Sequence, residues 1–297
     1  MTTQVQIPDP PKISNEEMQK CRDSGDYMPI LFEWYKFVAQ MCIFYALIER
    51  DSPAVRDVPP IQYAVITGLL NRCARLMLSN IALSHNGRFG ETTSLLDRCI
   101  FESCLKVEWL CYKRSEESFK RYLADGLKTE IELMAEIKGE IANREKGQTL
   151  NIEKRMLKSI KRHMDLAGLS EEEIKKIKKL PDTAAMIEEL GYQRLTYVVV
   201  QRIGSHHVHG TWSSLLLHYL EEKEGGKLVL KDHDCDTHPN QFVMLMFWVI
   251  KAMSAFIGFI FEDEEDIMSM HKLLESIREE IQKINSEMSE GDFDAVM

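Results

Sequence analysis

The sequence predicts an all-α, multi-helix bundle. Apolar residues recur in runs of about twenty residues, which are too long for single strands and typical of buried helices. Prolines, glycines and short polar clusters separate these runs, and no internal repeat is apparent. Because long helices joined by short turns pack against one another around a core, we expect a helical bundle.

Four long helices are expected in the first half of the chain. An apolar run follows Pro29 and ends near residue 49, and the proline-bearing segment 51–60 connects it to a helix over residues 61–84. A turn at residues 85–87 precedes a third helix over residues 89–113. Ser115 before two glutamates resembles a helix cap, which predicts a fourth helix that ends near residue 143.

The second half is predicted to contain shorter helices before two long ones. Ser170 before three glutamates favours a short helix, and Pro181 opens another. Residues 192–220 are expected to be helical, with interruptions at Gly204 and Gly210. A short irregular or hairpin insert near residues 224–236 then precedes helices over residues 242–261 and 267–288.

Charge divides the chain into three expected regions. These are a flexible N-terminal arm (1–27), a helical bundle domain (28–261) with a basic helical insert (144–190), and an acidic C-terminal helix and tail (262–297). Residues 144–179 hold eleven Lys/Arg and six acidic side chains, whereas residues 262–297 hold three and twelve. With a formal net charge of −10, only a local basic site for nucleic acid is expected. The basic stretch either follows a phosphate backbone or forms a solvated pair of amphipathic helices.

Cysteine usage and the N-terminal residues predict a cytoplasmic protein. The seven cysteines are scattered without a CxxC pair, which is typical of a reducing compartment. Residues 1–12 have no signal-peptide pattern. The apolar segment 242–261 is long enough to span a membrane, but Lys251 at its middle would cost about 2.5–3.5 kcal/mol there. We therefore expect a buried core or dimer helix and no stable membrane insertion.

A histidine-rich run is the main candidate for a functional site. In an unbroken helix, Arg202, His206, His209 and Ser213 share a face about 60° wide, and His207 points away from it. Ser205 lies on the flank of that face. Three interpretations stay open: internal packing, an acid/base site in which an arginine stabilises phosphate-like charge, and a metal site.

The metal interpretation has the weakest support from spacing. His207 and His209 are a possible pair, but no tight metal motif includes them, so neither a metal nor another cofactor is expected. Further possible ligands lie downstream: His233, Asp234, Asp236 and His238.

A second candidate is the pair Arg98 and Glu102 on the third helix. The two residues are four apart and share a helix face. With Lys106 they could form a solvated stripe of weak ion pairs. The apolar flanks favour a buried helix instead, and a buried pair could reach the histidine segment.

Together these segments resemble an uncharacterised bacterial family of helical domains. Arg98-x-x-x-Glu102 matches its R-x-x-[FI]-E motif, and Tyr197 with Ser205-x-x-x-His209-Gly210 matches its Y…S-x-x-x-H-G motif. The resemblance covers residues 31–220, approximately.

A broader resemblance is to the higher-eukaryote-and-prokaryote nucleotide-binding (HEPN) superfamily. Its motif is an arginine followed, after four to six intervening residues, by a histidine, as in Arg202 to His207 or to His209. Ile203 departs from the polar residue that usually follows the arginine. Its members are helical bundles, often dimeric, and many are metal-independent ribonucleases of defence or toxin systems.

The resemblance implies a candidate endoribonuclease, or a protein that binds RNA or nucleotides, acting as a homodimer. Two alternatives are a non-catalytic helical interaction or regulatory protein and a metal-dependent hydrolase. The expected catalytic residues are Arg202, His207, His209, Glu102 and Arg98, and the expected substrate-binding residues are Ser205, His206 and Tyr197.

Overall fold

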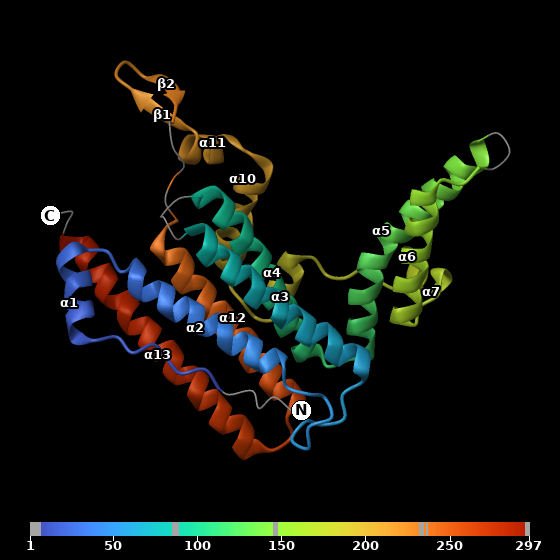
Figure 1. Ribbon diagram of the computed structural model, residues 1–297, viewed down its shortest axis with the longest axis horizontal. Coiled ribbons are helices and arrows are strands. Elements are labelled where there is room, and N and C mark those ends of the chain that lie inside the picture. Colours follow the sequence, from blue (N-terminus) through green and yellow to red (C-terminus); the bar gives the residue numbers. More distant parts are fainter. Residues whose placement is uncertain (1–6, 85–88, 145–147, 232–234, 236, 295–297) are drawn as a thin grey trace. The chain divides into compact units, whose positions relative to one another are not determined.

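The computed structural model describes residues 7–84, 89–144, 148–231, 235 and 237–294. These residues form helices, one two-stranded hairpin and their connections, so the predicted all-α bundle is confirmed. The chain separates into two compact units (Figure 1). Unit 1 comprises Met1–Tyr112 and Thr183–Met297, and unit 2 comprises Lys113–Asp182.

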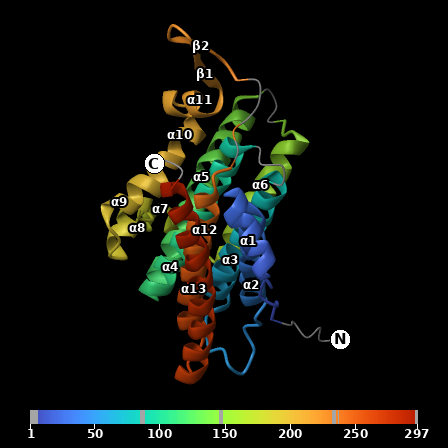
Figure 2. The ribbon, with the colours of Figure 1, turned by 90° about the vertical axis from the view of Figure 1, so that its left-hand side faces the viewer.

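The core of unit 1 is built by long, apolar helices. They are α2 (Met28–Ala46), α3 (Pro60–Ser84), α4 (Gly90–Lys113), α12 (Pro239–Ile260) and α13 (Glu264–Asp294). Helix α12 lies beside α2, α3 and α13 (Figure 2). Aromatic rings interlock across it, because Tyr35 meets Phe242 and Phe101 meets Trp248 edge-on, each at 4.7 Å between ring centroids.

Helix α12 is the candidate membrane span that the sequence indicates. Within the described residues it alone has the length and composition for a membrane crossing, with a mean hydropathy of 2.1. Two thirds of that apolar stretch (67%) is buried inside the protein, as in a core helix. The side chain of Lys251 is exposed, and its Nζ lies 4.6 Å from the ring centroid of Tyr192 and 4.9 Å from that of Trp248.

Part of the expected flexible arm is a helix, which corrects that prediction. Helix α1 (Asn15–Ser24) starts at a capping box between Ser14 and Glu17. It buries Cys21, and Arg22 pairs with Glu287 of α13 at 2.9 Å. These contacts fix the segment on unit 1. Residues 1–6 lie outside the described residues.

Unit 2 is a helical hairpin with a short third helix. Helices α5 (Glu116–Asn143) and α6 (Asn151–Ala167) run side by side (Figure 1), and α7 (Glu171–Lys176) packs on α5. Ser115 and Ser170 cap α5 and α7, as the sequence predicts. The unit extends beyond the expected insert 144–190 at its start and ends earlier, because α5 contributes half of its core and α8 (Thr183–Glu189) belongs to unit 1.

The segment after residue 191 changes helix type several times. It forms α9 (Arg194–Thr196), the π-helix η2 (Tyr197–Ile203), α10 (Gly204–His209) and α11 (Trp212–His218). Strands β1 (Leu220–Lys223) and β2 (Lys227–Leu230) then pair antiparallel, with Glu221 opposite Val229. The predicted hairpin thus starts four residues earlier than expected. The predicted turn at 85–87 and residues 232–234 and 236 lie outside the described residues.

Candidate functional site

Arg98 and Glu102 form a partly buried ion pair on α4. The Nε atom of Arg98 donates to Oε1 of Glu102 at 3.1 Å, and the two side chains are 21% and 28% exposed. Both have partners on another segment, so the solvated-stripe interpretation is wrong. Water screens a partly buried ion pair less than an exposed one. Losing one partner would leave the other charge partly buried without a counter-charge, which lowers the stability of the fold.

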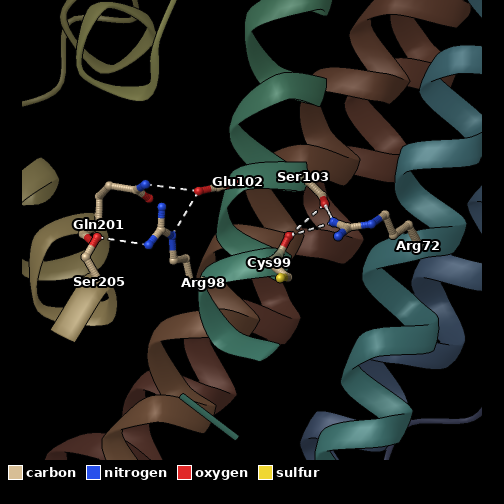
Figure 3. A network of polar contacts seen from close by, with 7 residues as sticks. All are labelled: Arg72, Arg98, Cys99, Glu102, Ser103, Gln201 and Ser205. Carbon is tan, nitrogen blue, oxygen red and sulfur yellow. Dashed lines mark hydrogen bonds and ion pairs between the residues drawn. The ribbon is translucent and has the colours of Figure 1, made fainter. Parts of the chain in front are cut away.

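The ion pair meets the segment that carries the histidines. Arg98 donates from Nη1 to Oγ of Ser205 at 2.9 Å, and Gln201 donates from Nε2 to Oε1 of Glu102 at 3.0 Å (Figure 3). The hydroxyl of Ser205 donates in turn to the carbonyl of Gln201 at 2.8 Å. The two bonds from α4 to this segment join residues about one hundred positions apart, so the ion pair contacts the histidine-bearing segment, as expected from the sequence.

Helix α4 is also held from its other side. Arg72 of α3 donates from Nη1 to the carbonyl of Cys99 at 3.0 Å and to the hydroxyl of Ser103 (Figure 3). Ser103 donates to the same carbonyl at 2.7 Å. Arginine contacts on both sides of one helical turn fix the position of Arg98 against α10.

Gly204 lies against the side chain of Arg98. A Cβ atom at this position would lie 3.6 Å from Cβ of Arg98, which is ordinary contact distance, so atoms beyond Cβ would press on Arg98. Gly204 starts α10 without interrupting the helical path, whereas Gly210 ends α10 with a positive φ of 54°. Only the second of the two expected interruptions is present.

The π-helix changes which residues face α4. Over seven residues it turns by less per residue than an α-helix, so a face drawn at 100° per residue does not apply. Arg202, His209 and Ser213 are exposed, and Ser213 lies in α11 beyond the break. Gln201, Gly204 and Ser205 face α4 instead. Arg202, His206, His209 and Ser213 therefore do not form a common face against α4.

The three neighbouring histidines have different surroundings. His206 shares a 2.7 Å hydrogen bond between Nδ1 and Oγ1 of Thr211, which holds the end of α10. His207 contacts buried His218, with 3.2 Å between Nδ1 of His207 and Nε2 of His218. His209 is exposed, and the described residues give it no hydrogen-bond partner.

His207 is held in its neutral form. Burial lowers its pKa from the usual 6.5, and His218 and His206 lower the pKa further, whereas Glu91 opposes them. Glu91 accepts from Oγ of Ser214 at 2.7 Å and from the hydroxyl of Tyr219. A neutral imidazole next to a carboxylate is suited to accept a proton near neutral pH.

His207 and Arg98 line the same pocket, which has a volume of about 250 Å³. Asp97 is the third charged or titratable residue of its wall. The apolar part of the wall comes from η2 and α12, and amides and a hydroxyl complete it. The other lining residues are Ser94, Val199, Val200, Gly204, Asn240, Gln241, Met244 and Leu245.

Asp97 is a site residue that the sequence reasoning missed. Burial raises its pKa from 3.8 to about 7, against the lowering effect of a 2.6 Å hydrogen bond from Nδ2 of Asn80. A carboxyl group with this pKa carries a proton for part of the time at neutral pH and can donate it. An acidic residue next to Arg98 in an apolar helix was the available signal.

Tyr197 does not line this pocket. It lies with Tyr192, Arg194 and Glu188 in a separate pocket of about 400 Å³. The expected substrate-binding residues are therefore divided: Ser205 joins the Arg98 network, His206 caps α10, and Tyr197 belongs elsewhere. Arg202 and His209 also lie outside the walls of the pocket that holds Arg98.

In the described part of the chain, no group of three or more His, Cys, Asp or Glu side chains is placed to hold a metal ion. His238 caps α12 by accepting from the backbone N–H of Asn240 at 3.2 Å. The other candidate ligands downstream, His233, Asp234 and Asp236, lie outside the described residues.

The fold and the site define a helical protein with a partly buried guanidinium, a carboxyl group and an imidazole around one pocket. The sequence profile of a family of unknown function (DUF5677) matches residues 63–227, more than half of the chain. The protein therefore belongs to this family, and the matched residues include α4, η2 and α10. No curated protein and no solved structure matches the chain.

Proposed function

We propose that the protein is a metal-independent endoribonuclease whose active site is the pocket lined by Asp97, Arg98 and His207. The observation that carries the proposal is the convergence of these three side chains, from two distant segments, on one pocket. A cation, a neutral base and a protonatable carboxyl group are the components that phosphodiester transesterification needs.

The proposed reaction transfers two protons. His207 takes the proton of a ribose 2′-hydroxyl, and the 2′-oxygen forms a bond to phosphorus. Arg98 stabilises the charge on the phosphorane oxygens. Its Nη2 atom is available for this contact, because it makes no hydrogen bond with residues that the structure describes. The bond from phosphorus to the 5′-oxygen breaks as Asp97 protonates that oxygen. The products are a 2′,3′-cyclic phosphate and a 5′-hydroxyl.

Glu102, Gln201 and Ser205 are assigned positioning roles. They hold two nitrogen atoms of Arg98, either directly or through one another, so they fix the plane of the guanidinium. Each is expected to affect the rate through Arg98 and not through the proton transfers. Their loss should therefore reduce kcat without moving the pH optimum.

The test is cleavage of a single-stranded RNA with one fluorophore, in the presence of EDTA. The protein is expected to cut the RNA and leave cyclic phosphate ends, and Arg98→Gln should reduce kcat at least about 100-fold. Arg202→Gln is the matched control, because it removes an exposed arginine three residues before Ser205. Equal rates for the two variants, or no cleavage by the parent protein, would contradict the proposal.

A second candidate function, homodimeric interaction, is favoured by exposed apolar side chains. Trp212 is 58% exposed, Leu217 54% and Leu230 78%, on α11 and the hairpin. Such side chains are typical of interfaces. Sedimentation should find a dimer, and Trp212→Glu with Leu217→Glu should give monomers. A parent protein that is still monomeric at roughly 50 µM, a concentration at which weak dimers form, would reject this candidate.

A further inference from the structure

The two units carry opposite charge. Residues 113–182, which make up unit 2, contain seventeen basic and fourteen acidic side chains, a formal charge of +3. Since the whole chain carries −10, the residues of unit 1 carry −13. A basic unit within an acidic protein is the charge asymmetry expected of a surface that recognises a polyanion.

The basic side chains of α6 share one side of the helix. At 100° per residue its five Lys/Arg fall within an arc of about 120°, and all five are exposed. The arc contains one acidic residue, Asp165, so the face carries a clear excess of positive charge. We call it the basic face of α6: Lys154, Arg155, Lys158, Lys161 and Arg162.

Neighbouring acidic side chains do not neutralise this face. Glu153 is buried on the opposite side, where both of its oxygens accept from Arg144, at 2.7 Å and 2.6 Å. Glu130 of α5 pairs with His163, at 2.8 Å between Oε1 and Nδ1. These two acids have partners outside the basic face, so its own cations remain available to solvent.

The apolar side of α6 is already occupied, which decides between two kinds of polyanion. Ile160 is buried, and Met164 packs against the core that α5 and α7 share. An amphipathic helix binds a membrane by inserting its apolar side, and here Ile160 and Met164 at the centre of that side already pack within unit 2, although Ile152 and Leu166 stay exposed. A phosphate backbone requires only the cations. From Lys154 to Arg162 they extend over about 12 Å, enough for several consecutive phosphates.

We propose that the basic face of α6 binds the phosphate backbone of RNA. The choice of RNA as the polyanion rests on the proposed ribonuclease function. The face and the active-site pocket belong to one chain, so binding at unit 2 raises the effective concentration of RNA at unit 1. Neutralising the face should therefore raise KM and leave kcat nearly unchanged.

The experiment measures RNA affinity in a protein that cannot cut. Lys154→Gln, Lys158→Gln and Lys161→Gln are combined in the full chain with His207→Gln. Binding of a fluorescent 20-nucleotide RNA is followed by anisotropy between about 50 and 300 mM NaCl. Each lost phosphate contact should reduce the slope of log K against log salt by about 0.7, so the triple variant should lose about 2 in slope and at least tenfold in affinity at 100 mM.

A matched control removes the same charge from unit 1. It combines substitutions by glutamine at three exposed lysines of α1 and α13: Lys20, Lys272 and Lys283. This control should retain its affinity within about twofold, apart from a general charge effect. Thermal unfolding of both triple variants should match the parent protein, because all six side chains are exposed.

The outcomes separate this inference from the proposed function. Equal affinity and slope in the two triple variants would overturn the role of the basic face, even if the parent protein cuts RNA. Binding only to vesicles with about 30% anionic lipid, and not to RNA, would also overturn it. RNA binding that depends on the face in a parent protein that does not cut would support the inference and reject the ribonuclease proposal.

Discussion

Replacing Asp97 by asparagine should stabilise the protein, and more so as the pH rises. The substitution removes a charge that burial disfavours and keeps an oxygen that can accept from Nδ2 of Asn80, 2.6 Å away. The same nitrogen also lies 3.3 Å from the hydroxyl of Tyr35, so the local hydrogen bonds stay in place. The expected effect is therefore electrostatic.

The sign and size follow from the raised pKa of Asp97. Its pKa is about 7 in the folded protein, against 3.8 for an ordinary aspartate. The folded state holds the proton more tightly, so the stability from this group is fully present below pH 3.8 and is lost as the pH rises to about 7. Three pKa units correspond to about 4 kcal/mol. Because Asp97 lines a solvent-accessible pocket, we expect about half of that.

Urea unfolding of both proteins between pH 5 and pH 8 measures this effect. The advantage of Asp97→Asn in the free energy of unfolding should grow with pH and level off above pH 7. About 1 kcal/mol should be gained over the range, because about two of the three pKa units lie above pH 5. Asp165→Asn, the same change at an exposed side chain, is the control for the substitution itself. An advantage that is constant or falls with pH would refute the reasoning.

Three further substitutions test the surroundings of the site. Glu102→Gln should lower the free energy of unfolding, measured in urea, by about 1–3 kcal/mol, because Arg98 loses its charge partner. A change of less than about 0.3 kcal/mol would mean that water screens the ion pair. Gly204→Val should lower the melting temperature and the cleavage rate because the larger side chain displaces Arg98, whereas Gly204→Ala should be tolerated. Equal losses in the two variants would contradict the contact between Gly204 and Arg98. Burial raises the pKa of Glu108 from 4.5 to about 7, so Glu108→Gln should stabilise the protein above pH 7 by up to about 3 kcal/mol. The glutamine oxygen can still accept the hydrogen bond from the hydroxyl of Tyr192. A lower free energy of unfolding for this variant at pH 8 would contradict the prediction.

Much of the fold could be predicted because its helices carry long apolar faces. The boundaries of α2, α3 and α12 follow from apolar runs and prolines, and those of α5 and α7 from capping serines. Helix α1 was missed because it buries only Cys21, which leaves almost no apolar pattern. Its signal was local, the Ser14–Glu17 capping box.

The site could be predicted in part. An ion pair in an apolar helix indicated a partner elsewhere, and the contacts of Arg98 and Glu102 with the segment 201–205 supply it. The orientation of the histidines could not be predicted, because a π-helix gives no reliable signal in a single sequence. Asp97 was missed because its raised pKa depends on burial next to Asn80, seventeen residues away in the chain.

The comparison of His207→Gln with His209→Gln tests the central claim most directly. The two histidines are two residues apart, but only His207 lines the pocket with Arg98. In RNA cleavage with EDTA, His207→Gln should lower kcat at least about 100-fold, and His209→Gln should stay within about threefold of the parent protein. A large loss with His209→Gln and none with His207→Gln would contradict the account.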